Sequence, residues 1–377
     1  MSQVETTVSV GLRLTCSASG LAQKVALTAR AVSTRTTVQV LSGLVLSAER
    51  GQQLDLAATD MDLSLRTSLE AEVESEGRVV VPARLLVEVA RLLPQPIVTL
   101  EHRSEEGIVL LTCGSAQYRL HTYSAEDFPR LPEVGASSTF AVSRQPFLHT
   151  LSRVSRAASR DESRPVLTGI LVRVEGSRLV MAATDSYRLA VKETVLEGEA
   201  PTLDAIVPAR ALAELMRVAQ DGDELRLALH ENHVLLGTGD VWLTTRRIDG
   251  QFPDYKQLLP EAFEHEVRLP RDELLDVVRR VGVMAQRNSP LRLRFADGEL
   301  TISARTPDVG EARESLEVAF VGEPFEIGFN SDFLREGIES VEEAEIDLKL
   351  ISPLRPGLIR SQADNFWYLI MPIRLAG

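Results

Sequence analysis

The sequence has 377 residues, of which 44% are hydrophobic and 25% charged, the composition of a globular protein. No apolar run approaches the roughly 18 residues that span a membrane, and the first twenty residues lack the pattern of a signal peptide. Taken alone, the net charge of −13 argues against binding to nucleic acid, because phosphate groups bind where the surface potential is positive. The two cysteines lack metal-ligand spacing, which favours lone thiols in a reducing cytosol.

The chain repeats itself at a spacing of about 125 residues. Val80–Leu85 returns as Ile206–Ala211, and Ala57–Asp60 returns as Ala182–Asp185. A third, weaker copy has Phe325–Asn330 at the corresponding place. The repeat predicts three domains of ordinary size, with the boundaries 12–136, 137–260 and 261–377.

Each repeat is expected to open with a strand and a helix. Apolar residues at helical spacing form one face in each copy: Leu21, Val25, Thr28 and Val32, then Phe147, Leu151, Val154 and Ala158, then Leu274, Val278, Val281 and Ala285. Alternating runs such as 108–112 and 169–174 predict half-buried strands joined by short turns. A second helix is expected from Pro82, Pro208 and about Ser331. The fold class is therefore α+β, with two helices and about eight antiparallel strands in each repeat.

Positive charge gathers on the first helix of each repeat. The segments 17–35, 141–160 and 269–287 together carry 11 basic and 3 acidic residues, although the whole chain has 41 basic and 54 acidic ones. For any one helix a solvated face would explain this, but the recurrence indicates a positive stripe on an acidic body. Such a stripe suits weak, mobile, sequence-independent contact with a polyanion.

Two other classes of function fit the sequence less well. An enzyme would depend on carboxylates such as Asp60 and Asp185, but these are repeat equivalents that more simply complete a turn. The six histidines share no motif and no nucleophile–histidine–acid set is visible. A peptide-binding scaffold without DNA would not need the biased helix charges. Catalysis, cofactors and metals are therefore not expected.

The motifs together resemble the bacterial DNA polymerase III beta subunit family, the sliding clamps, over about residues 12–375. Each motif is modest, but their order on a threefold repeat is specific. The matching stretches are Val79–Arg84, Arg119–Thr122, Asp127–Pro129, Ala183–Ala190, Asp249–Tyr255, Ile327–Asn330 and Tyr368–Leu375.

The resemblance implies three clamp domains in each chain, with helices packed on antiparallel sheets. A head-to-tail homodimer would then form a closed ring of six domains around duplex DNA. Twelve helices about 10 Å apart make a circle roughly 38 Å across, which leaves roughly 28 Å clear of helix. A duplex passes through such a hole with water and counterions, so topology rather than affinity would hold it.

A partner pocket for short linear peptides is also implied, between the second and third domains. Its matching positions are Leu167, Thr184, Ser186, Tyr187, Arg188, Leu189, Pro253, Leu258, Asn330, Phe333, Leu354, Pro356, Met371, Pro372, Ile373, Arg374 and Leu375. Apolar side chains would form the groove, and arginines would hold carbonyls or a carboxylate. Without the resemblance, Leu167, Leu189 and Leu375 would be interpreted as core residues. Ser186-Tyr187 replaces a Gly-His pair, Gln257 replaces a frequent arginine, and Ala376-Gly377 follow the usual end, which affects peptide preference.

DNA contacts and the subunit interface complete the implied sites. Family positions that face the hole match Arg35, Arg160 and Arg164, and the charge pattern adds Lys24, Arg84, Arg153, Arg210 and Arg287. Tyr118 and Leu120 should meet Val283 and Met284 of the partner subunit's third domain in the implied dimer, with rim charges from Glu311 and Glu314.

The implied role is a non-catalytic processivity factor in the cytoplasm, associated with the nucleoid. Its expected partners are a second copy of the chain, duplex DNA of any sequence, the polymerase III alpha subunit and the clamp loader delta subunit. Translesion polymerases, mismatch-repair proteins and ligase are expected to use the same pocket. The sequence does not separate a housekeeping clamp from a specialised second one.

Overall fold

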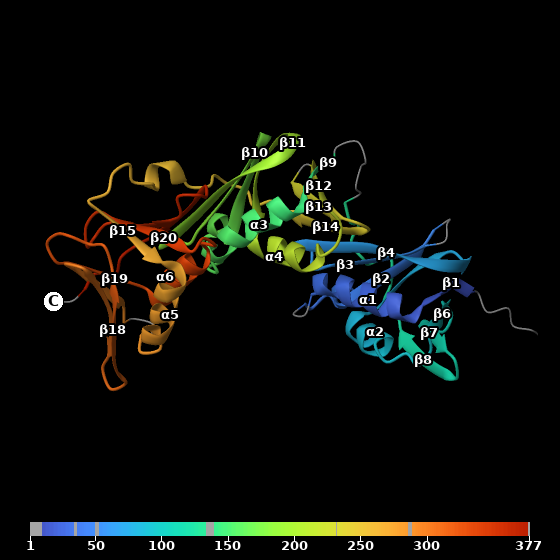
Figure 1. Ribbon diagram of the computed structural model, residues 1–377. Coiled ribbons are helices and arrows are strands. Elements are labelled where there is room, and N and C mark those ends of the chain that lie inside the picture. The colour runs from blue at the N-terminus through green and yellow to red at the C-terminus, as the bar shows by residue number, and fades with distance from the viewer. Residues whose placement is uncertain are drawn as a thin grey trace, which may run out of the picture. The chain divides into compact units, whose positions relative to one another are not determined.

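The computed structural model describes residues 10–33, 36–49, 53–132, 139–230, 232–285 and 289–375. The chain forms two compact units, one made of residues 1–141 with 210–246, the other of residues 142–209 with 247–377. In the described residues, no helix is both long and apolar enough to cross a membrane. Figure 1 labels many of the elements of both units.

The first unit is built on a twelve-stranded sheet whose neighbours pair antiparallel in the order β8-β7-β6-β1-β4-β14-β13-β12-β9, with β2, β3 and β5 off this path. Because β14 pairs with β4, the sheet continues from the first repeat into the second. The strands are β1 (Val10–Ser17), β2 (Gly43–Ala48), β3 (Gln53–Thr59), β4 (Leu63–Ser75), β5 (Gly77–Pro82), β6 (Ile97–Arg103), β7 (Ile108–Cys113), β8 (Ala116–His121), β9 (Phe140–Ser143), β12 (Glu224–His230), β13 (His233–Thr238) and β14 (Val241–Arg246).

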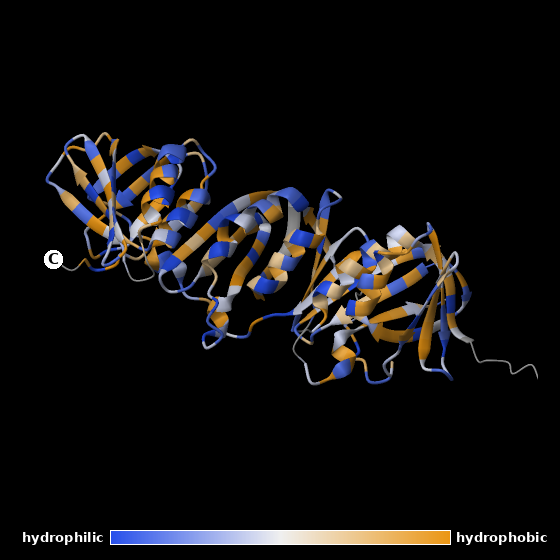
Figure 2. Ribbon diagram, turned by 90° about the horizontal axis from the view of Figure 1, so that it is seen from below, coloured by the Kyte–Doolittle hydropathy of each residue, from blue (hydrophilic) through white to orange (hydrophobic). Residues whose placement is uncertain are grey.

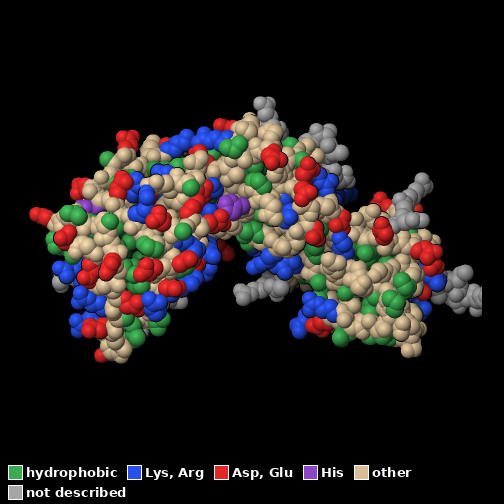
Figure 3. Space-filling model, viewed as in Figure 1, with side chains coloured by type: hydrophobic (Ala, Val, Ile, Leu, Met, Phe, Trp, Pro, Cys, Tyr) green, Lys and Arg blue, Asp and Glu red, His purple; other side chains and the backbone are tan. Residues whose placement is uncertain are grey.

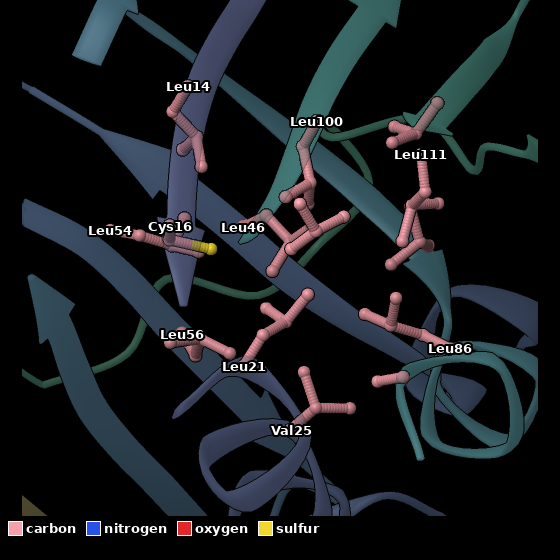
Figure 4. Packing of buried hydrophobic residues seen from close by; sticks show 14 of the residues in the cluster. Leu14, Cys16, Leu21, Val25, Leu46, Leu54, Leu56, Leu86, Leu100 and Leu111 are labelled. Carbon is pink, nitrogen blue, oxygen red and sulfur yellow. The ribbon is translucent and has the colours of Figure 1, made fainter. Parts of the chain in front are cut away.

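Helices α1 (Ala18–Thr28) and α2 (Ala83–Ala90) cover the core of the first repeat, and α4 (Ala209–Val218) follows in the second. Short 3-10 helices occupy Ala29–Ala31 and Gln39–Ser42. Leu21 and Val25 of α1 point toward Leu46, Leu86 and leucines of β1, β3, β6 and β7 (Figure 4). The predicted helical face is therefore the buried one, although its last member, Val32, lies beyond the end of α1.

The two thiols lie in this core, unpaired, as predicted. Burial raises the pKa of Cys16 to about 12. At pH 8 only about one such thiol in ten thousand is ionised, and the thiolate is the reactive form. We expect the thiols of the native protein to react with a thiol reagent at pH 8 at least ~1,000-fold more slowly than a free cysteine. In denatured protein both thiols should react rapidly. Rapid reaction of a thiol in the native state would contradict this packing.

The second unit holds two antiparallel sheets. The six-stranded sheet contains, in order, β10 (Gly169–Thr184), β11 (Arg188–Pro208), β22 (Phe366–Ile370), β21 (Gly357–Arg360), β20 (Glu345–Leu350) and β15 (His265–Pro270). The four-stranded sheet contains β18 (Gly310–Glu317), β17 (Glu299–Thr306), β16 (Leu291–Ala296) and β19 (Phe325–Phe329). The helices are α3 (Arg144–Val154), α5 (Arg271–Gly282) and α6 (Ser331–Glu339), with 3-10 turns η4 (Ser155–Ala157), η5 (Pro165–Thr168) and η6 (Tyr255–Leu258).

The expected order of strand and helix is present in all three repeats, but two details differ. Pro82 and Pro208 end strands, and α2 and α4 begin one residue later than predicted. The described part of the middle repeat has six strands rather than eight, because β10 and β11 form one long hairpin. Hydrophobic and hydrophilic residues alternate along the strands in Figure 2, as the period of two requires.

Candidate functional site: a partner pocket and a DNA-facing surface

The turn that joins β10 to β11 shapes the candidate partner pocket. Asp185 Oδ1 accepts hydrogen bonds from the backbone N–H groups of Tyr187 at 2.9 Å and Arg188 at 3.0 Å. Ser186 has a φ of 78°, which presents its side chain and that of Tyr187 to solvent. Asp60 accepts equivalent bonds in the first repeat. The prediction that these carboxylates complete a turn is thus confirmed, and both are occupied in structural hydrogen bonds.

Arg188 lies inside the molecule, with 8% of its area exposed, and its guanidinium is enclosed by partners. It donates to Asp185 Oδ2 at 3.1 Å, to Glu336 on α6, to the Tyr368 hydroxyl at 3.2 Å, and to a backbone carbonyl of η4. Burial disfavours the charged form, but the Tyr368 and Glu336 groups raise the pKa of Arg188 above its ordinary value. The arginine therefore connects the turn, α6 and β22 rather than pointing into open solvent.

Helix α6 and the end of β22 lie beside this turn. Asn330 accepts a hydrogen bond from Phe333 N at 3.0 Å and so caps α6. The Phe333 ring lies 4.2 Å from the Arg188 guanidinium, and its carbonyl accepts from the Tyr368 hydroxyl at 2.9 Å. Met371 N donates to Tyr187 O at 2.8 Å, so the last strand is fixed beside the turn.

The connector that follows β14 contributes Pro253 and Leu258. Asp254 caps η6 through Lys256 N, and Tyr255 of that turn packs into a core cluster with Leu189. Leu258 itself is 48% exposed. The buried Tyr255 therefore fixes the short segment that carries the exposed Leu258.

The remaining predicted pocket residues fall into three groups. Thr184 and Leu189 are buried, and Leu189 is a core residue as the reading without the resemblance expected. Tyr187, Leu354 and Met371 are exposed hydrophobic residues, and Leu354 and Pro356 lie in the segment between β20 and β21. Those partly or fully open to solvent are Leu167 on η5, Ser186, Pro253 and the C-terminal residues Pro372, Ile373, Arg374 and Leu375.

Of the six described cations predicted to face DNA, four are exposed, and three of these four have an acidic neighbour. Arg84 on α2 is 90% exposed and 3.1 Å from Glu88, and Arg210 on α4 is 61% exposed and 2.6 Å from Asp60. Lys24 on α1 pairs with Asp240, Arg164 lies 3.1 Å from Asp161, and Arg160 is exposed. Arg35 and Arg287 lie outside the described residues.

Arg153 requires a correction. Only 3% of its side chain is exposed, and it lies 2.9 Å from Asp364 and 3.5 Å from Glu342. Its guanidinium also covers the Phe366 ring at 4.5 Å. The residue is on the predicted basic helix but belongs to its packed side, so it has neither the exposure nor the free charge that a phosphate contact needs.

The predicted interface residues lie at two sheet edges and one helix end. Tyr118 and Leu120 are on β8, where Leu120 is in the core and Tyr118 packs against it. Val283 follows α5 and is 76% exposed, with Met284 beside it. Glu311 and Glu314 are on β18, and Glu314 pairs with Arg280 of its own chain at 2.7 Å.

Sequence reasoning did not single out the acids of α6. Glu339 binds Arg156 and Arg279, whose hydrogen bonds hold its pKa below the ordinary value although burial raises it. Glu336, one turn earlier on α6, binds Arg188 of β11. Acidic and basic side chains are interspersed around α5 and α6 in Figure 3. Their spacing of three residues was visible, but their partners come from distant segments and could not be read from the chain.

Family models for the three domains of the DNA polymerase III beta subunit match residues 12–132, 141–254 and 256–374. The chain is 35% identical over 376 residues to the beta sliding clamp of Streptomyces coelicolor, covering 95% of this chain and 98% of that one. The sliding clamp of Bacillus subtilis superposes with a TM-score of 0.92 at 26% identity, over 97% of this chain and all of that chain. A Pseudomonas aeruginosa clamp, solved bound to griselimycin, gives 0.89 at 30% identity over the same shares.

These matches and the threefold repeat define a DNA clamp. More specifically, the chain belongs to the DNA polymerase III beta subunit family, and its function is that of a sliding clamp, a processivity factor in replication.

Proposed function

We propose that two copies of this chain close head to tail into a ring of six domains around duplex DNA. The observation that carries the proposal is the pair of strand edges: β8 ends the twelve-stranded sheet and β18 ends the four-stranded sheet. An edge strand has unpaired backbone groups and readily pairs with another chain. β8 of one copy would pair with β18 of the other, with Tyr118 and Leu120 of one meeting the exposed Val283 of the next.

Within this ring the three domains would follow the boundaries 12–136, 137–260 and 261–377. Their division differs from that of the compact units because strands pair across repeats, β4 with β14 and β11 with β22. The exposed cations Arg84, Arg160 and Arg210 would face the phosphates without reading bases.

The pocket built around Tyr187, Phe333 and Met371 would bind short linear peptides. Exposed apolar side chains on a rigid hydrogen-bonded frame suit such a ligand. The partners proposed for it are the polymerase III alpha subunit, the clamp loader delta subunit, translesion polymerases, mismatch-repair proteins and ligase. The chain would act without catalysis, as an accessory subunit, in the cytoplasm on the nucleoid, where its DNA partner lies.

The test is retention on DNA after loading by a clamp loader. On a nicked circle the protein should remain bound at high salt, and it should be lost once the circle is cut, because only topology holds it. Gel filtration of the reaction over time measures both. Equal salt sensitivity on circular and linear DNA would mean electrostatic binding alone and would refute the ring.

A further inference from the structure

The first unit has a groove whose lining contains none of the residues predicted to contact DNA, the peptide or the second subunit. Its volume is about 810 Å³, within the range of ligand sites, and it lies where the segment Phe128–Leu131 crosses β2 and β5. Val45, Leu56 and Phe128 contribute an apolar floor, and Trp242 of β14 extends the groove at one end.

A repeat-related groove of about 650 Å³ occupies the second unit. It is lined by Leu171, the equivalent of Val45, and by Phe252, the equivalent of Phe128. Pro253, which is also predicted for the partner pocket, is one of the residues that line this second groove. The same local architecture is therefore present twice, and its charges can be compared position by position.

At two equivalent positions the second groove has an aspartate where the first has an arginine. In the second unit Arg173 lies opposite Asp204 in the sheet, and the two form an ion pair at 2.8 Å. In the first unit the corresponding pair is Ser47 opposite Arg78, so the arginine has changed strands and its aspartate is absent. The residue after Phe-Pro changes likewise, from aspartate in the second repeat to Arg130 in the first.

Arginines thus line the first groove with apolar surface between them. The Arg78 guanidinium lies 5.9 Å from the Phe128 ring, and Arg226 lies 4.5 Å from the Trp242 ring. Among the described residues, no carboxylate forms an ion pair with Arg78 or Arg130. Of the three acids in the groove, Asp240 is already held by Lys24 and Thr67.

We propose that this groove is a second docking site, which binds an extended peptide segment of a partner protein whose acidic side chains alternate with apolar ones. The arginines would bind the carboxylates, and the floor between them would take the apolar side chains. Single-stranded DNA fits less well, because base stacking needs open aromatic faces and both rings here are covered by arginine or buried. The site is independent of the partner pocket in the other unit.

Fluorescence anisotropy with a labelled ten-residue peptide of alternating glutamate and leucine tests the proposal. We expect saturable binding that weakens with salt, and at least tenfold weaker binding when glutamine replaces glutamate. The variant Arg78→Asp with Arg130→Asp, which gives these two positions the aspartates of the second repeat, should also bind at least tenfold more weakly. Both arginines are exposed, so circular dichroism and retention on nicked circles should be unchanged.

The charge-matched control is Arg91→Asp with Arg294→Asp, two exposed arginines outside the groove, which should bind the peptide as the parent does. If this control loses as much peptide affinity as the groove variant, the effect comes from net charge alone and the proposed site is wrong. Loss in Met371→Ala would move the peptide to the partner pocket. Absence of binding at millimolar peptide, or binding of oligothymidylate that the Arg78 and Arg130 changes abolish, would also refute it.

Discussion

Replacing Arg188 by alanine is expected to lower the free energy of unfolding of the second unit by about 3–5 kcal/mol, the usual cost of removing one partner of a buried ion pair. The change leaves Glu336 and Asp185 without their cation, and the Tyr368 hydroxyl and an η4 carbonyl without their donor. Urea unfolding in a Trp242→Phe background, where the fluorescence comes only from Trp367 on β22 beside Tyr368, measures the loss.

Two variants separate this structural role from direct peptide contact. Arg374→Ala removes an exposed arginine of the same predicted pocket and should change stability by less than about 0.5 kcal/mol. Arg188→Lys keeps the charge but not the planar geometry, so it should recover only part of the loss. If Arg188→Ala unfolds like the parent but loses peptide binding, the guanidinium contacts the peptide and not the frame.

The fold was accessible from sequence because its signals are local and repeated. The Thr-Asp motif at Asp60 and Asp185 predicts a turn in each of two repeats, and both carboxylates accept the expected backbone bonds. The helical faces around Leu21 and Phe147 were also identified by their period. The continuous sheets were not, since pairing of β4 with β14 joins residues nearly 180 positions apart and leaves no periodic trace.

The candidate site was predicted less well, because charge in a sequence does not reveal exposure. Arg153 and Arg160 are both cations of one basic segment, yet the structure buries the first and exposes the second. Similarly, Arg188 matched a pocket motif, but its partner Glu336 belongs to a helix 148 residues away. Only tertiary packing decides whether such an arginine contacts a ligand or stabilises the frame.

Because Arg153 is buried, its replacement is expected to have the second large effect on stability. Arg153→Glu would place a carboxylate within reach of Asp364 and Glu342, in a site that is 3% exposed and floored by Phe366. Loss of the buried cation alone costs about 3–5 kcal/mol, and the added repulsion increases it, so the second unit should be largely unfolded at 37 °C. Thermal unfolding followed by Trp367 fluorescence in the same Trp242→Phe background measures this.

Arg160→Glu is the matched control, on the same basic segment but exposed. Its free energy of unfolding should stay within about 0.5 kcal/mol of the parent's. The slope of log K for DNA against log salt concentration should become shallower by about the contribution of one phosphate contact. DNA contact therefore has to be tested at Arg160 and not at Arg153, since a variant of Arg153 would lose DNA simply by unfolding. A folded Arg153→Glu protein with weakened DNA contact would show instead that this side chain leaves its acidic partners to meet the phosphates.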